Sequence, residues 1–236
     1  MTKLDETKTK IFAIEILKLF KQEYSYNQLS VFIKLPIPVL SRYINGHVLP
    51  NIERSKEIIE MFKKKYLIDI LMGKIKSNED GTFDHSEILS NANLLEKIAK
   101  IVFHDFNFAK VNKILSVESD GIPLAIQIGK EFGVNTIIAK RNKEMGVKDF
   151  IEVKRFYLTG TYSYLYIPKN SIKKGEFILL IDDVIRTGST IEALMEICKK
   201  VGANVAGVFA IMSIGDSIKK LKKKLTCPVK AMIEFD

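Results

Sequence analysis

Two adjacent carboxylates, Asp182 and Asp183, stand between an apolar run at 177–181 and a short loop rich in hydroxyl groups. Such an apolar run predicts a strand buried on both faces, and a helix is expected at 189–201. Acids at the carboxyl end of such a strand can bind ribose hydroxyls or a hydrated Mg²⁺. The hydroxyls and N–H groups of the Thr187-Gly188-Ser189-Thr190 loop, where the helix begins, can hold a monophosphate. These residues predict a site for a phosphorylated sugar.

The elements that must position this site follow an alternating order. Helices are expected at 92–103, 122–132 and 189–201, and strands at 113–117, 136–139, 177–181, 205–211 and 229–233. This alternation predicts an α/β domain with a doubly wound parallel sheet. Residues 149–168 interrupt it with alternating apolar and aromatic residues around Thr159-Gly160, which predicts a long antiparallel hairpin. Its tyrosines are more typical of a hairpin face than of a platform for stacking bases.

The N-terminal third predicts a small all-α domain. Helices are expected at 7–23, from a cap at Ser25 to residue 33, at 37–44, and from residue 52 onward. Two short helices joined by a tight turn are typical of a helix-turn-helix, with a plain helical bundle or a dimerisation module as the alternatives. Residues 53–76 could form one long helix, and the polar run at 77–81 is a domain boundary. We expect a helix-turn-helix domain at 1–66, a connector at 67–83 and the α/β domain at 84–236.

Composition narrows the class of protein. The net charge is +9, and residues 1–76 carry 14 Lys and Arg against 8 Asp and Glu. This bias favours a polyanion-binding N-terminal module, or reflects only a lysine-rich composition. The two cysteines, Cys198 and Cys227, are too few for a disulfide framework. No apolar run is long enough to cross a bilayer and the first residues are too polar for a secretory signal, so we expect a cytoplasmic protein without a membrane partner.

The segment 180–190 resembles the phosphoribosyl-pyrophosphate signature of type I phosphoribosyltransferases, and the resemblance extends over about residues 84–215. Within that family it is most similar to adenine and xanthine transferases and to the bacterial purine-operon repressor. The resemblance implies that Asp182 and Asp183 hold the ribose hydroxyls and that the 5′-phosphate is held by Arg186, Thr187, Gly188, Ser189 and Thr190.

The resemblance also implies a second anion site. Pyrophosphate would be bound by backbone amides, possibly through a non-proline cis peptide, in the loop Glu118, Ser119, Asp120 and Gly121. Lys140 and Arg141 would form a basic pair beside it. Mg²⁺ is expected only together with phosphoribosyl pyrophosphate, and neither a protein metal site nor a side chain for acid–base catalysis is predicted. His85 and His104 have no evident partners in the sequence and are given no function.

The run 40–50 resembles phage-repressor-like helix-turn-helix domains, and the two domains together resemble archaeal orotate-phosphoribosyltransferase-like regulators. The resemblance implies a homodimer on double-stranded DNA, with contacts from Ile37, Pro38, Ser41, Arg42, Asn45 and His47. Arg42 is the one candidate for reading a guanine, unless it contacts a phosphate or forms a structural ion pair. Ile37 and Pro38 can only touch thymine methyl groups.

Two residues depart from the phosphoribosyltransferase pattern. Ser189 replaces a glycine, but its hydroxyl can still donate to phosphate. Asp120 stands where many relatives carry Lys or Arg, and a like-charge pair at ~4 Å costs about 4 kcal/mol at an effective dielectric near 20, unless Mg²⁺ intervenes. We therefore predict a transcriptional regulator that senses phosphoribosyl pyrophosphate or a purine nucleoside monophosphate, and that is not an enzyme. The alternatives are an active purine phosphoribosyltransferase of nucleotide salvage and an RNA-binding attenuator.

Overall fold

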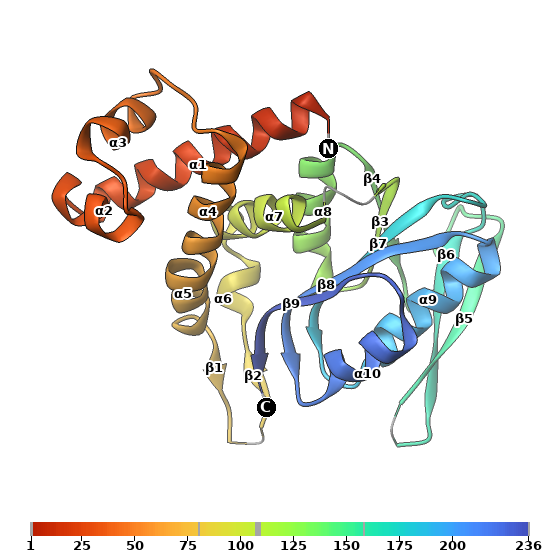
Figure 1. The fold of residues 1–236 in the computed structure, drawn as a ribbon. Coiled ribbons are helices and arrows are strands. Elements are labelled where there is room, and N and C mark those ends of the chain that lie inside the picture. The colour runs from red at the N-terminus through yellow and green to blue at the C-terminus, as the bar shows by residue number, and fades with distance from the viewer. Residues whose placement is uncertain (1, 80, 107–109, 158, 236) are drawn as a thin grey trace. The chain divides into compact units, whose positions relative to one another are not determined.

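The computed structural model describes residues 2–79, 81–106, 110–157 and 159–235. The chain forms two compact units, Met1–Lys76 and Ser77–Asp236 (Figure 1). Across the described ranges, no helix combines the length and the apolar character that a membrane span requires.

The first unit is all-α, as predicted. It consists of α1 (Lys3–Glu23), α2 (Tyr26–Ile33), α3 (Ile37–Ile44), α4 (Ile52–Phe62), the π-helical turn η1 (Lys63–Leu67) and α5 (Ile68–Met72). The predicted cap at Ser25 is confirmed: its hydroxyl accepts the Gln28 N–H, and the Gln28 side chain accepts the Ser25 N–H. The long helix expected at 53–76 is instead interrupted by η1 and ends at Met72.

Aromatic side chains hold this unit together. The Phe20 ring lies edge-on to Phe32 and to Tyr66, with centroids 5.6 and 5.4 Å apart. Leu29 of α2 and Leu40 of α3 are fully buried. The two short helices thus each contribute an apolar side to the core, which is the pattern expected of amphipathic helices.

The second unit is built on a five-stranded parallel sheet. Its strands are β3 (Lys113–Val117), β4 (Asn135–Ala139), β7 (Phe177–Ile185), β8 (Asn204–Ile214) and β9 (Val229–Phe235). The sheet order is β4-β3-β7-β8-β9. Its helices are α6 (Ser86–Leu89), α7 (Ala92–Phe106), α8 (Gly121–Phe132), α9 (Ser189–Val201) and α10 (Ser217–Lys224). The predicted parallel α/β fold is confirmed.

The strand order reverses direction between β3 and β7. From β3 the chain passes through α8 to the outer strand β4, whereas β7, on the other side of β3, leads through α9 to β8. Ligands of open α/β sheets bind at such a switch point, beyond the carboxyl ends of the strands. The loops that follow β3 and β7 are therefore adjacent in space, although β3 ends at Val117 and β7 only at Ile185.

Strand β7 is longer than the sequence suggested. The strand was expected to end at residue 181, but it continues to Ile185 and pairs Asp182 with Ala210 of β8. Both acids therefore lie inside the last part of the strand. Backbone pairing with β8 holds them in place, which a free loop would not do.

Two smaller pairs of strands lie outside this sheet. The predicted hairpin is confirmed as β5 (Phe150–Phe156) and β6 (Tyr162–Pro168), which pair antiparallel from Phe150–Pro168 to Phe156–Tyr162. Val153 on β5 is buried in the sheet core, so alternate residues of this strand face the domain. A short pair, β1 (Lys76–Ser77) and β2 (Phe83–Asp84), precedes α6.

Candidate active site

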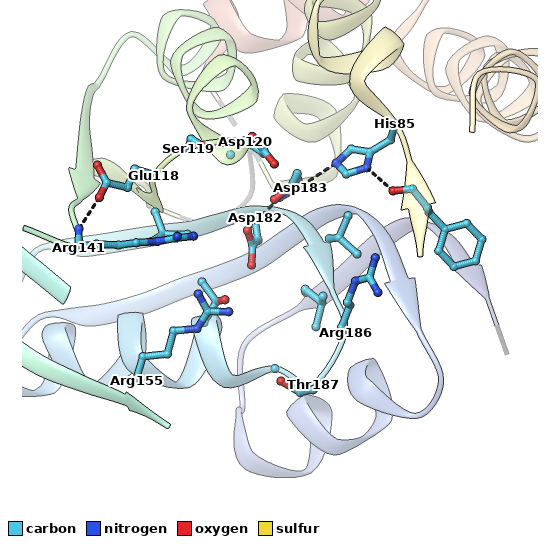
Figure 2. A pocket seen from close by; sticks show the side chains of 17 residues that line it. His85, Glu118, Ser119, Asp120, Arg141, Arg155, Asp182, Asp183, Arg186 and Thr187 are labelled. Carbon is cyan, nitrogen blue, oxygen red and sulfur yellow. Dashed lines mark hydrogen bonds and ion pairs between the residues drawn. The ribbon is translucent and has the colours of Figure 1, made fainter. Parts of the chain in front are cut away.

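A cavity of about 350 Å³ lies at the carboxyl ends of β3 and β7, near the lower end of the ~300–1,000 Å³ usual for small-ligand sites. Figure 2 shows the side chains around it. The cavity is lined by Phe83, His85, Val117, Glu118, Ser119, Asp120, Gly121, Arg141, Arg155, Asp182, Asp183, Val184, Ile185, Arg186, Thr187, Gly188 and Thr190.

Most residues expected to bind the sugar phosphate and the pyrophosphate come together here. Two do not line the cavity. Ser189 lines a neighbouring hollow beneath the β5–β6 hairpin. Lys140 pairs with Glu144, with Nζ and Oε2 2.7 Å apart, so only Arg141 of the expected basic pair lines the cavity.

The loop after β3 is held close to the sheet. The peptide bond between Glu118 and Ser119 is cis, as the resemblance implied. Glu118 Oε1 accepts the backbone N–H of Arg141 at 2.5 Å, which ties this loop to the residue after β4. A Cβ added at Gly121 would lie 2.5 Å from Ser116 Oγ, too close for any side chain. Glycine at this position therefore lets α8 begin directly against β3.

The two acids of β7 differ in their surroundings. Asp182 is only 4% exposed, and its burial, together with the adjacent charge of Asp183, raises its pKa well above the usual value. Burial would also raise the pKa of Asp183, but hydrogen bonds from His85 and with Asp182 hold it below the usual value. Asp183 therefore carries the negative charge of the pair, while Asp182 takes up a proton more readily.

His85 is a residue of the site that the sequence analysis missed. Its Nε2 lies 2.7 Å from Asp183 Oδ2, and its Nδ1 lies 3.4 Å from the carbonyl oxygen of Phe83 (Figure 2). The hydrogen bond to Asp183 raises the pKa of His85. The Phe83 ring stacks on Phe235 with centroids 4.7 Å apart, which anchors the short strand β2 that directly precedes His85. No sequence signal connects His85 with the signature segment, since only the fold brings them together.

The loop after β7 forms the opposite side of the cavity. Gly188 has a φ of +83°, a conformation that favours glycine, and directly precedes α9. The Ser189 N–H donates to Thr187 Oγ1 at 3.3 Å. Backbone donors and hydroxyls thus gather at the positive end of a 13-residue helix, where an anion is stabilised.

Arg155, the second residue that the sequence analysis missed, comes from the β5–β6 hairpin. It lies two positions after Val153, on the strand face that meets the domain. Its Nε donates to Ser189 Oγ at 3.4 Å. Three arginines, Arg141, Arg155 and Arg186, therefore line the cavity that also contains Asp120. The only sequence signal for Arg155 was the two-residue alternation of this strand, which places Arg155 on the same face as Val153.

The residues expected to contact DNA lie on or just after α3 in the other unit. Ile37, Pro38, Arg42, Asn45 and His47 are exposed and Ser41 is half-buried. Asn45 Nδ2 donates to Ser41 Oγ at 3.2 Å. Solvent exposure of these side chains does not distinguish a DNA-binding surface from any other surface. The DNA contacts therefore stay a prediction.

Comparisons with known proteins identify relatives of this chain. Residues 84–235 match the phosphoribosyl transferase domain family. A hypoxanthine/guanine phosphoribosyltransferase of Methanothermus fervidus is 30% identical over 148 residues, 63% of this chain and 76% of that protein. A protein of the same name from Methanohalobium evestigatum is 30% identical over 192 residues, covering 80% and 92% of the two chains.

Solved structures share the fold. An adenine phosphoribosyltransferase from Thermoanaerobacter pseudethanolicus has a TM-score of 0.64 at 18% identity, and covers 71% of this chain and 99% of its own. An APRTase from Giardia lamblia has a TM-score of 0.64 at 21% identity, with 71% and 97% covered.

These findings overturn the prediction of a DNA-binding regulator without enzymatic activity. The relatives by sequence are named as purine phosphoribosyltransferases, which favours the enzyme that stood as the alternative. The physical reason for the error lies at Asp120. Its carboxylate was weighed as an isolated charge facing pyrophosphate, whereas the fold places it in a cavity that Arg141, Arg155 and Arg186 also line.

Proposed function

The chain belongs to the phosphoribosyl transferase domain family, and on that premise we propose that it is an active purine phosphoribosyltransferase. The observation that carries this proposal is the single cavity that joins the loop at 118–121, the acids of β7 and the loop at 186–190. Its dimensions and charges suit a ribose that bears a phosphate at one end and a pyrophosphate at the other. The names of the relatives make hypoxanthine and guanine the first bases to test, and adenine the second.

The proposed reaction transfers the phosphoribosyl group from pyrophosphate to the base. The bond between C1 of the ribose and the pyrophosphate oxygen breaks, and its electron pair leaves with pyrophosphate. A bond forms between C1 and a ring nitrogen of the purine, and the proton of that nitrogen passes to water. Because the transition state is expected to gather positive charge on the ribose and negative charge on the leaving group, catalysis requires preorganised charges more than acid–base side chains.

Each part of the cavity has a place in this scheme. Asp183, held by His85, accepts from a ribose hydroxyl, and Asp182 supports it from the adjacent strand position. Arg141 supplies positive charge beside the 118–121 loop, where pyrophosphate would leave. The hydroxyls and amides at 187–190 hold the 5′-phosphate at the start of α9.

The donor groups also fit Mg²⁺, which takes oxygen ligands, keeps several waters and commonly binds through one or two carboxylates plus substrate phosphates. Among the acids that line the cavity, Glu118 accepts from Arg141 and Asp183 pairs with His85. Asp120 accepts only from the neighbouring Ser119 hydroxyl, at 3.0 Å, among the described residues. We assign to Asp120 the binding of hydrated Mg²⁺. Mg²⁺ held there would neutralise charge on the pyrophosphate oxygens.

A steady-state assay tests the function. The purified chain is mixed with phosphoribosyl pyrophosphate, Mg²⁺ and one purine, and nucleotide formation is followed by chromatography. Hypoxanthine or guanine is expected to be converted to its nucleotide. Asp183→Asn should lower kcat/KM by about 10- to 100-fold, which corresponds to the free energy of one hydrogen bond to a charged group. Failure of the folded protein to convert hypoxanthine, guanine or adenine would falsify the proposal.

A further inference from the structure

Arg155 reaches the cavity from outside the two loops that form the phosphate sites. It belongs to β5, and its side chain lies on the face of the hairpin opposite to that of Lys154, its neighbour in sequence. Lys154 instead lies over the rings of Tyr162 and Tyr164, with Nζ 4.5 and 5.9 Å from the ring centroids. Two adjacent cations on one strand thus face different surroundings, and only Arg155 lines the cavity.

Most donors of Arg155 are unused. A guanidinium has five N–H groups in a planar fork. Among the described residues, the Nε–H donates to Ser189 Oγ at 3.4 Å, and the guanidinium carbon lies 5.0 Å from the ring centroid of Tyr157. Its charge acts on Asp182, but no carboxylate of the described chain lies within ion-pair distance of it. The terminal N–H groups at the edge of the cavity are therefore available to an anionic ligand.

Arg141 and Arg155 lie at different ends of the cavity. Figure 2 shows Arg141 beside Glu118, and Arg155 on the side where Thr187 and the start of α9 lie. The hydrogen bond from Arg155 goes to Ser189, the first residue of that helix. A planar guanidinium matches two phosphate oxygens at once, which a lysine ammonium does not.

We propose that Arg155 binds the 5′-phosphate of the substrate together with the loop at 186–190. The phosphate then accepts hydrogen bonds from the Arg155 guanidinium on one side and from the N–H groups at the start of α9 on the other. Ser189 is a positioning residue, because its hydroxyl holds Nε and leaves the outer N–H groups facing the ligand. The consequence is specificity for phosphorylated over unphosphorylated ribose. This inference rests on the part of the function proposed above that places a phosphorylated ribose in this cavity.

The test measures equilibrium binding of two base-independent probes, ribose 5-phosphate and pyrophosphate, each with Mg²⁺, by isothermal titration calorimetry. Arg155→Ala should weaken ribose 5-phosphate binding by about 10- to 100-fold and change pyrophosphate binding less than about 2-fold. Arg155→Lys should recover only part of the loss, because it keeps the charge but not the fork. Arg141→Ala should show the reverse selectivity between the probes.

Lys154→Ala is the matched control, since it removes a neighbouring cation from the other face of the hairpin. It should leave both affinities unchanged, and circular-dichroism melting curves should show every variant folded. The inference is overturned if Arg155→Ala binds ribose 5-phosphate like the wild type, if Lys154→Ala loses as much, or if the wild type does not bind this probe. Arg155-dependent binding without purine turnover would instead refute the transferase function and leave the inference standing.

Discussion

His85 Nε2 and Asp183 Oδ2 lie 2.7 Å apart, although the two residues are 98 positions apart in sequence. Their side chains are 12% and 14% exposed. The pair joins the segment before α6 to the strand that carries the signature acids. One carboxylate oxygen of Asp183 is thereby occupied, and the orientation of the other is set by His85.

Removing His85 should therefore damage substrate binding through Asp183. His85→Ala is expected to lower kcat/KM for phosphoribosyl pyrophosphate by about 10- to 100-fold, as the loss of ~1.5–3 kcal/mol of charge-assisted hydrogen bonding predicts. His85→Gln, which keeps an N–H donor at a similar reach, should retain most of the activity. Steady-state kinetics of the two variants decide this, and equal losses in both would show that His85 does not act through its hydrogen bond.

Asp120 should govern the response to Mg²⁺. Chelation with EDTA should abolish turnover, because the pyrophosphate charge is then unscreened. Asp120→Asn should raise several-fold the Mg²⁺ concentration needed for half-maximal rate, and Asp120→Arg should make activity less dependent on Mg²⁺. Glu144→Gln removes an acid that pairs with Lys140 outside the cavity and serves as the control. A Mg²⁺ titration of Asp120→Asn that overlays the wild type would exclude this assignment.

A side chain at Gly121 should clash with Ser116, and a substitution of Ser116 should relieve this clash. The Cβ added at Gly121 would lie 2.5 Å from Ser116 Oγ, and Ser116 is fully buried with no hydrogen-bond partner for that oxygen in the described structure. Gly121→Ala should cost about 1–3 kcal/mol in free energy of unfolding, the usual effect of overpacking. Urea unfolding should show most of that loss recovered in the Ser116→Ala, Gly121→Ala double variant. No recovery would mean that the backbone, and not Ser116, causes the strain.

The two cysteines should differ in reactivity. Burial raises the pKa of Cys198 to about 12, so about one molecule in ten thousand carries the thiolate at pH 8. Burial also raises the pKa of Cys227, but that side chain is only half-buried. A thiol reagent such as DTNB should modify Cys227 in the native protein and Cys198 only after unfolding. Cys227→Ser should abolish the native reaction, and a remaining fast phase would contradict the burial of Cys198.

Local sequence determined much of this protein. The Ser25 cap with Gln28, the boundaries of α3 and the pairing of the β5–β6 hairpin depend on neighbours within a few residues or across one turn. Interactions of that range are visible as patterns in the chain. The signature at 182–190 was recognisable for the same reason, since its acids, glycine and hydroxyls are consecutive.

Tertiary structure alone decided what surrounds that signature. His85 meets Asp183 across 98 positions, and Arg155 meets Ser189 across 34, because strand order and packing bring these segments together. No local pattern encodes those contacts. The same limit explains the error over Asp120, whose repulsion was estimated as that of one carboxylate facing pyrophosphate. An electrostatic energy depends on every charge around a group, and Arg141, Arg155 and Arg186 come to line the same cavity as this carboxylate only in the folded chain.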